Sequence, residues 1–116
     1  MPYITGEARH QLSKGRHILS VGELNYMITR CMIEGREGDV YKTMQRYWEY
    51  GPKNYQRIND ILGADLGAQM EFTRRKGHGY YCDAVSQFYI NYASPYEDTK
   101  IKENGDVYGT GEQVSG

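Results

Sequence analysis

The residue types that most often ligate metals or act as nucleophiles are few in this chain of 116 residues. They are the three histidines and two cysteines, His10, His17, His78, Cys31 and Cys82. His78 and Cys82 are four positions apart, a spacing that places two side chains on one face of a helix. However, glycines on both sides of His78 disfavour a helix there, and a zinc site needs three or four ligands. We therefore predict surface histidines and reduced, buried cysteines, with no metal site and no cofactor.

Covalent catalysis requires a nucleophile and a base that are held together, and the sequence shows no such pair. It contains neither a Ser-His-Asp pattern nor a strand-turn-helix nucleophile elbow. The segment Gly35-Arg36-Glu37-Gly38 lacks the preceding strand and the Lys-Ser/Thr pair of a phosphate-binding loop. Asn104-Gly105-Asp106 lacks the alternating ligands and the bidentate Glu of a calcium loop. We predict that the protein is not an enzyme and has no catalytic residues.

One basic cluster, Arg74-Arg75-Lys76, is a candidate anion contact. It lies at the end of a predicted helix, where cations also stabilise the helix dipole. The whole chain has 14 Lys and Arg against 15 Asp and Glu, a net charge of −1. A general nucleic-acid binder needs a basic excess for its phosphate contacts, so we do not expect nucleic acid as a partner.

Tyrosine is the unusual residue type, with 12 copies against two Phe and one Trp. Two segments are especially rich in it, and from them we predict an interface formed by Tyr47, Trp48, Tyr50, Tyr80, Tyr81, Phe88, Tyr89 and Tyr92. Tyr and Trp are enriched at protein interfaces and in base-stacking pockets, and a buried Tyr needs a partner for its hydroxyl. Three interpretations remain open: a core with its rim, a macromolecular interface, and a pocket for a small ligand.

Apolar spacing and capping residues predict that helices position these side chains. Thr5, Ser20 and Asn54 are expected N-caps, and Ser20 with Glu23 forms a capping box. The predicted helices begin near Thr5, at Ser20, near Val40, at Asn54, at Tyr81 and at Ser94-Pro95, and the fourth runs to about Lys76. Since alternating strand patterns of useful length are missing, we predict an all-α fold, a compact bundle of four to six helices. A short extended or coil segment follows Gly105.

Two details of the chain's organisation also follow from composition. Gly63 and Gly67 lie four apart within the longest predicted helix, where each costs about 1 kcal/mol relative to Ala. Either another helix crosses closely there or the two glycines are merely tolerated. We expect a single helical domain over residues 1–108 and a Gly-rich tail over 109–116, which has too little apolar area to fold alone.

Several segments resemble a family of small uncharacterised proteins of tailed phages and prophages. The resemblance rests on Met1-Pro2-Tyr3-Ile4, Gly22-Glu23-Leu24-Asn25-Tyr26, the helix Tyr55–Arg75, and Pro95-Tyr96-Glu97-Asp98 followed by Lys102–Tyr108. It implies a phage context and no activity. We interpret the motif residues as structural, with Asn25 and Tyr26 reaching the C-terminal turn; the motif residues are Glu23, Asn25, Tyr26, Pro95, Tyr96, Asn104, Gly105 and Asp106.

Three functional hypotheses follow. The leading one is a phage-encoded accessory protein, an inhibitor or adaptor, that docks on a host or phage protein through its tyrosine-rich helices. The second is a minor virion or assembly component, oligomeric with copies of itself. The third is a sponge for a small nucleotide-like ligand, built from stacked Tyr with Arg74 and Arg75. We expect the bacterial host cytoplasm or the virion as its location. No apolar run approaches the roughly 18 residues that span a bilayer, and the start of the chain does not resemble a secretory signal.

The segment Gly77–Ser94 departs from the family pattern, and we predict that it builds an intermolecular contact. Its apolar face is Tyr81, Ala84, Val85, Phe88 and Tyr92, while Tyr80 and Tyr89 lie off that face or at its edge. Under this hypothesis, Tyr89→Ala weakens partner binding by about 2 kcal/mol or more and leaves the isolated fold nearly unchanged. The alternative is a helix buried in the centre of the bundle.

Overall fold

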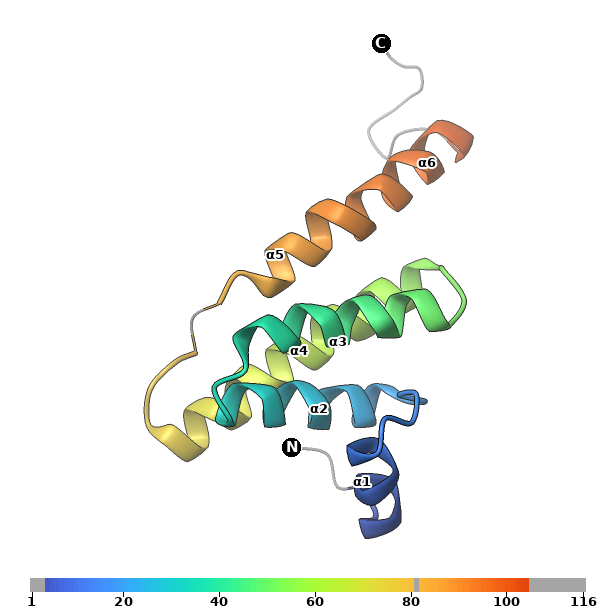
Figure 1. The fold of residues 1–116 in the computed structure, drawn as a ribbon. Helices are drawn as coiled ribbons and strands as arrows, with labels where there is room; N and C mark the ends of the chain where they lie inside the picture. The colour runs from blue at the N-terminus through green and yellow to red at the C-terminus, as the bar shows by residue number, and fades with distance from the viewer. Residues whose placement is uncertain (1–3, 81, 105–116) are drawn as a thin grey trace. The chain divides into compact units, whose positions relative to one another are not determined.

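The described part of the chain folds into helices joined by short loops. The structure is a computed structural model that describes residues 4–80 and 82–104. The helices are α1 (Gly6–Ser13), α2 (Val21–Ile33), α3 (Glu37–Tyr50), α4 (Tyr55–Lys76), α5 (Ala84–Phe88), a π-helical turn (Tyr89–Ala93) and α6 (Ser94–Asn104), as Figure 1 shows. The described residues contain no strand. The predicted all-α class is therefore confirmed, and the predicted coil after Gly105 lies outside the described residues.

The chain divides into two compact units, Met1–Val85 and Ser86–Gly116. We call them unit 1 and unit 2. The first four helices belong to unit 1, and the boundary falls inside α5. A single domain over residues 1–108 stays a prediction, and the predicted tail 109–116 lies outside the described residues.

Three side chains begin helices where the sequence predicted them. Thr5 Oγ1 accepts a hydrogen bond from the amide of Ala8 at 3.0 Å, and Ser20 Oγ accepts one from Glu23 at 3.2 Å. Asn54 Oδ1 accepts one from the amide of Arg57 at 2.8 Å. Each bond satisfies a backbone donor that has no partner inside its helix.

The capping box at α2 differs from its expected form. The Glu23 carboxylate does not reach back to the amide of Ser20; it accepts from the amide of Leu19 at 2.9 Å. The same carboxylate lies 2.9 Å from the Arg16 guanidinium, and this hydrogen-bonded ion pair holds the pKa of Glu23 below its ordinary value. Because Arg16 holds the Glu23 carboxylate, the carboxylate bonds the amide of Leu19 and not that of Ser20. The Arg16–Glu23 ion pair thus ties the α1–α2 loop to α2.

The core of unit 1 lies between α2, α3 and α4. Helix α2 packs against both other helices, and α3 packs on α4. Buried apolar side chains at helical spacing line these contacts; they include Leu24, Ile28, Met32, Val40, Met44, Ile58, Ile61 and Ala68. Burial of a large apolar side chain contributes roughly 1.5–3 kcal/mol, so this three-helix core is the main source of the unit's stability.

The two glycines of α4 have different surroundings. A Cβ atom at Gly67 would collide with the side-chain amide of Asn25 on α2, so α2 and α4 approach closely there. A Cβ atom at Gly63 would meet nothing within 4 Å. The prediction of a close helix crossing is therefore confirmed at Gly67, whereas among the described residues Gly63 has no neighbour that would explain a glycine.

Arg57 fastens the turn between α3 and α4. Its Nε and Nη2 atoms donate to the Tyr47 carbonyl at 3.0 and 2.6 Å, and its guanidinium carbon lies 3.8 Å from the centre of the Tyr47 ring. The guanidinium occupies the space that a Cβ atom at Gly51 would need. A Cβ atom at Gly51 would therefore displace the Arg57 side chain from this position.

Unit 2 corrects the prediction that the chain restarts at Ser94-Pro95. Ser94 has helical backbone angles, and its amide donates to the Tyr89 carbonyl across a π-helical turn. A proline within a helix lacks an amide donor, and its ring conflicts with the carbonyl four residues earlier. The wider turn of residues 89–93 gives that ring room, so α5, the π-turn and α6 form one continuous helix. This helix begins at Ala84, and the start predicted at Tyr81 lies outside the described residues.

Candidate functional site

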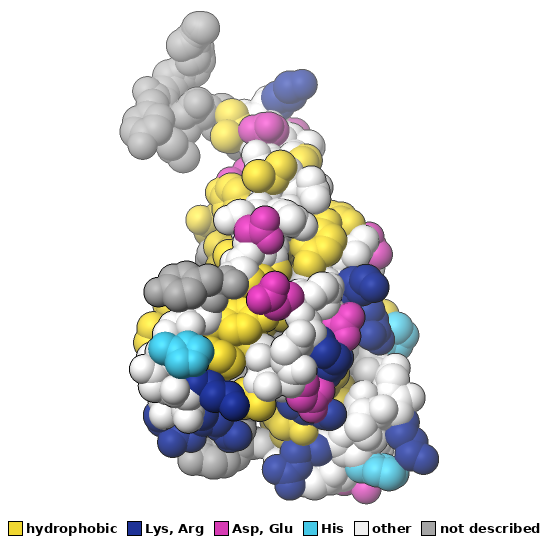
Figure 2. Space-filling model, turned by 60° about the vertical axis from the view of Figure 1, so that its left-hand side comes forward, with side chains coloured by type: hydrophobic (Ala, Val, Ile, Leu, Met, Phe, Trp, Pro, Cys, Tyr) yellow, Lys and Arg dark blue, Asp and Glu magenta, His cyan; other side chains and the backbone are white. Residues whose placement is uncertain are grey.

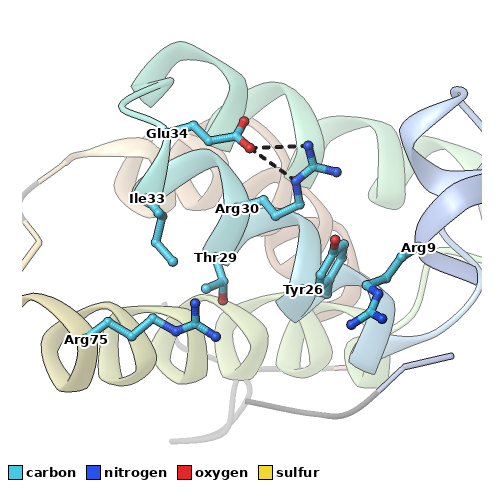
Figure 3. A pocket seen from close by; sticks show the side chains of 7 residues that line it. All are labelled: Arg9, Tyr26, Thr29, Arg30, Ile33, Glu34 and Arg75. Atoms are coloured by element: carbon cyan, nitrogen blue, oxygen red, sulfur yellow. Dashed lines mark hydrogen bonds and ion pairs between the residues drawn. The ribbon is translucent and has the colours of Figure 1, made fainter. Parts of the chain in front are cut away.

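A pocket of about 300 Å³ opens in unit 1 among α1, α2 and α4. Its lining side chains come from all three helices, and Figure 3 shows them: Arg9, Tyr26, Thr29, Arg30, Ile33, Glu34 and Arg75. Three of the seven are arginines, one from each helix. Arginine has a planar fork of donors that matches carboxylate and phosphate groups, so this composition is typical of a site for an anion.

The three guanidiniums differ in how far they are already engaged. Arg30 Nη2 lies 3.2 Å from Glu34 Oε2, and its guanidinium lies 5.9 Å from the centre of the Tyr26 ring. Arg75 Nε lies 2.7 Å from Glu71 Oε2. Within the described residues, Arg9 has neither an ion pair nor a side-chain hydrogen bond, and Figure 3 places its side chain beside Tyr26. Arg9 is therefore the arginine with most donors left for a ligand.

Glu71 organises the end of α4 from a buried position. Its side chain is 5% exposed, and its carboxylate contacts Arg74 at 2.6 Å and Arg75 at 2.7 Å. Hydrogen bonds from Arg74 and then Arg75 hold the pKa of Glu71 far below its ordinary value. The carboxylate thus stays ionised and orients Arg75, whose side chain Figure 3 shows reaching toward α2.

Glu34, at the other end of the pocket, also binds two arginines. Its carboxylate is shared between Arg36, at 2.7 Å, and Arg30, and these hydrogen bonds lower its pKa. Each of the two carboxylates, Glu34 and Glu71, therefore bonds to two arginines. Arg36 also pairs with Asp39 at 2.7 Å, so the Glu34 group is balanced. Glu71 carries one negative charge against Arg74 and Arg75, so its group keeps one positive charge in excess, and Arg9 adds another.

The predicted anion contacts are separated by the fold. Arg75 lines the pocket, whereas Arg74 and the exposed Lys76 are not among the lining residues. Sequence reasoning missed Arg9, Arg30 and Tyr26 as members of this site. Their positions along the chain carry no local signal, because only the packing of α1 and α4 against α2 brings them together.

A comparison with protein families identifies the domain that contains this pocket. A family model described as a domain of unknown function, DUF6899, matches residues 1–85. The chain belongs to this family. The matched residues coincide with unit 1, so the whole pocket lies within the DUF6899 domain. No curated protein and no solved structure matches the chain.

The DUF6899 match covers part of the resemblance seen in the sequence. It includes the Met1–Ile4 start, the Gly22–Tyr26 block and the Tyr55–Arg75 helix, and it ends before Pro95. The prediction that the chain belongs to an uncharacterised family is thus confirmed. The phage origin and the motif-level resemblance remain predictions.

The aromatic residues predicted to form an interface are divided between core and surface. Tyr47, Trp48 and Phe88 are buried, at 5%, 3% and 0% exposure. Tyr50 is 53% exposed, and its ring stacks on His17 with centroids 3.8 Å apart. Figure 2 shows hydrophobic side chains reaching the surface between basic and acidic ones. The buried residues of the set therefore present no surface in this fold.

The remaining aromatic residues of the set lie around residues 80–92. Tyr80 packs edge-on against Phe72, with ring centroids 4.9 Å apart; its hydroxyl is buried and has no hydrogen-bond partner among the described residues. Burial raises the pKa of Tyr80 to about 12. Tyr89 is 38% exposed and donates to Glu97 at 2.8 Å, and Tyr92 stacks on Phe88. Tyr81 lies outside the described residues.

The motif residues mostly have partners close to their own helices. Asn25 meets Gly67 on α4, and the Thr29 hydroxyl lies 3.1 Å from Asn25 Oδ1. Tyr26 lines the pocket, and Glu23 pairs with Arg16. In unit 2, Pro95 lies in the first turn of α6, Tyr96 has the Lys100 ammonium 5.6 Å from its ring centre, and Asn104 ends α6. Gly105 and Asp106, and the C-terminal turn that Asn25 and Tyr26 were expected to reach, lie outside the described residues.

Both cysteines are free, and neither has the environment of an activated thiol. Cys31 is buried and Cys82 is half-buried, and burial raises the pKa of both thiols. A nucleophilic thiol needs the opposite shift. The described residues contain no group of three or more His, Cys, Asp and Glu that would hold a metal ion. None of the helices in residues 4–80 and 82–104 combines the length and the apolar character that crossing a membrane requires.

Proposed function

We propose that this DUF6899 protein is a non-enzymatic binding protein whose ligand is a small, phosphate-bearing, nucleotide-like anion. The observation that carries the proposal is the convergence of Arg9, Arg30 and Arg75 from three helices on one pocket. This is the third of the hypotheses that the sequence left open, with Arg9 and Arg30 in place of Arg74.

Charge and shape support this ligand class. The ion pairs around the pocket leave an excess of positive charge, although the chain as a whole carries −1. A volume of about 300 Å³ is at the lower end of ordinary ligand pockets and exceeds the size of a bare phosphate ion. The Tyr26 ring and the Ile33 side chain add an apolar wall beside the guanidiniums. A ligand with one anionic end and one flat apolar end matches both features.

The experiment is a calorimetric titration of the full chain with inorganic phosphate, a panel of nucleoside monophosphates and the corresponding nucleosides. We expect a nucleotide to bind, phosphate to bind more weakly, and the nucleoside without phosphate to bind least. Arg9→Gln should weaken nucleotide binding roughly tenfold or more, the cost of losing a charge-assisted hydrogen bond. Arg46→Gln is the matched control, because Arg46 is exposed on α3 and does not line the pocket.

Two results would contradict the proposal. One is the absence of heat and of any rise in melting temperature across the whole panel. The other is equal weakening by Arg9→Gln and Arg46→Gln, which would indicate a general charge effect. Binding to the pocket should also weaken as salt is added, because salt screens the attraction between arginine and phosphate.

The biological setting belongs to the same proposal. We infer a phage-encoded accessory protein, present in the bacterial host cytoplasm, that acts by binding. Docking on a host or phage protein remains the second candidate, and the exposed rings of Tyr50 and Tyr89 support it. Affinity capture from infected cells tests docking. Mass spectrometry of purified particles tests the virion alternative, since a virion component must be present in stoichiometric amounts.

A further inference from the structure

Glu34 is an anion in a pocket whose other charged side chains are arginines. It is the one carboxylate among the residues that line the pocket. Figure 3 shows its carboxylate beside the Arg30 guanidinium, with two hydrogen bonds between them. A phosphate group that binds Arg30 therefore meets a carboxylate that is already placed on the same guanidinium.

Glu34 makes two arginine contacts, and the one to Arg30 is the weaker. Arg30 Nε and Nη2 lie 3.3 and 3.2 Å from Glu34 Oε2, which is long for hydrogen bonds between charged groups. Arg36 Nε and Nη2 lie 2.9 and 2.7 Å from Glu34 Oε1. Both side chains of the Arg30–Glu34 pair are partly exposed. An exposed pair of this helical spacing changes an equilibrium only about twofold.

Arg36 remains as a partner for Glu34 when Arg30 is released. Arg36 precedes α3 and is not among the residues that line the pocket. Glu34 caps the end of α2, so its side chain can turn about its own bonds without disturbing the helix. Exposed side chains change rotamer within nanoseconds. Release of Arg30 therefore costs one weak contact and leaves Glu34 in an ion pair.

Glu71 has the opposite character on α4. It is 5% exposed, does not line the pocket, and lies 2.7 Å from Arg75 Nε. Displacing such a carboxylate would leave a buried charge without its partner, which is costly. Glu71 therefore stays in place and orients Arg75, whereas Glu34 lies where the ligand would bind.

We propose that Glu34 is an internal competitor for the ligand: a phosphate group takes Arg30 from Glu34, which then bonds to Arg36 alone. The inference rests on the proposed nucleotide-binding function and adds the residue that regulates access to the site. A phosphate monoester carries about two negative charges at pH 7, so it attracts Arg30 more strongly than one carboxylate does. Before a ligand arrives, Glu34 neutralises Arg30; after the exchange, Arg9, Arg30 and Arg75 are all available to the phosphate.

The first test is calorimetric titration of the full wild-type chain and of Glu34→Gln with inorganic phosphate and the common nucleoside monophosphates. Glu34→Gln should raise the affinity about threefold or more, because it removes both the competitor and a charge that repels phosphate. Glu37→Gln is the matched control. Glu37 is exposed, lies three positions further along the chain and does not line the pocket, so its substitution should leave the affinity nearly unchanged. Circular dichroism checks that both variants keep their helices.

The outcomes separate this inference from the proposed function. If the wild type binds nucleotide and Glu34→Gln binds it equally or more weakly, the competitor role is overturned and the proposed function stands. Equal strengthening by Glu34→Gln and Glu37→Gln would also overturn the competitor role, as a general charge effect. Binding by Glu34→Gln alone would support the competitor role and overturn nucleotide binding by the wild type. Absence of binding in both chains would overturn both proposals.

The second test uses Arg36, which lies outside the pocket. Arg36→Gln removes the other partner of Glu34, so Glu34 should hold Arg30 more firmly and nucleotide binding should weaken about threefold. In the Glu34→Gln background the same substitution should change the affinity much less, because the competing carboxylate is gone. Equal weakening in both backgrounds would show that Arg36 acts only through its charge, and would overturn the exchange.

Discussion

Glu71 and Asp65 are two buried carboxylates of α4 in opposite environments. Each is 5% exposed. Glu71 is bound by Arg74 and Arg75, whereas Asp65 accepts a hydrogen bond from the neutral Gln69 amide at 2.6 Å. A buried carboxylate is stabilised in its charged form by paired guanidiniums and destabilised by burial without them. Two acids of the same helix should therefore contribute to stability with opposite pH dependence.

For Glu71, the folded state holds the pKa below its ordinary value of 4.5. The folded state therefore binds fewer protons than the unfolded state, and this contribution to stability is complete above about pH 4.5 and is lost as the pH falls further. We expect Glu71→Gln to lower the free energy of unfolding at pH 7 and to cost less at pH 3, where the carboxyl of the unfolded chain is protonated. Urea denaturation at both pH values measures this. An equal cost at both would show that shape, and not charge, matters at Glu71.

For Asp65, burial raises the pKa above its ordinary value of 3.8. The folded state then binds more protons than the unfolded state, so stability falls as the pH rises from 3.8 through the folded-state pKa. Asp65→Asn keeps the shape and removes the buried charge, so it should stabilise the fold at pH 7 by on the order of 1 kcal/mol. The gain should vanish below pH 3.8. Destabilisation at pH 7 would contradict this account of Asp65.

At the scale of the helix, the two glycines of α4 should respond to Ala with opposite signs. Gly63→Ala adds a side chain in open space and should stabilise the monomer by about 1 kcal/mol through helix propensity. Gly67→Ala should destabilise it, because the added carbon displaces the Asn25 amide from its place beside Thr29. Thermal unfolding of dilute, monomeric samples measures both. Stabilisation by Gly67→Ala would show that α2 and α4 move apart easily.

The π-turn of unit 2 gives a second prediction at this scale. Tyr89 and Glu97 are eight positions apart, which in a regular α-helix separates two side chains by roughly 80° around the axis. The wider turn brings them nearly into line, and the Tyr89 hydroxyl bonds Glu97 at 2.8 Å. Pro95→Ala supplies the missing amide, so we expect a regular α-helix and loss of this bond. NMR checks this through a slowly exchanging amide at position 95 and a changed Tyr89 ring signal; unchanged spectra would show that proline does not cause the π-turn.

At the scale of the whole molecule, the family match and the compact unit end at the same residue. Both cover residues 1–85, and the core of α2, α3 and α4 lies within them. We expect a fragment of residues 1–85 to fold alone, with a cooperative thermal transition and a helical circular dichroism spectrum. Its nucleotide binding, if the pocket proposal holds, should match that of the full chain. A fragment without a cooperative transition would show that DUF6899 needs the helices of unit 2.

Much of the helix pattern was determined by the sequence alone, because its causes are local. Thr5, Ser20 and Asn54 cap helices through side chains that reach only three residues ahead, and Gly77 ends α4 by adopting a φ of 79°. The error at Ser94-Pro95 has a local cause too. The same pair that starts many helices can also continue one when the preceding turn widens, and sequence alone does not distinguish the two cases.

The tertiary structure decided which faces are buried and which arginines meet. Helix α4 is apolar on two sides, so its pattern could not show that Ile58 and Ile61 face the core while Leu66 and Met70 face outward. Arg9, Arg30 and Arg75 are far apart in the chain and converge only because α1, α2 and α4 pack together. Capping depends on hydrogen bonds within one turn, whereas a pocket depends on contacts between helices. The first is encoded by neighbouring residues and the second by the packing of the whole unit.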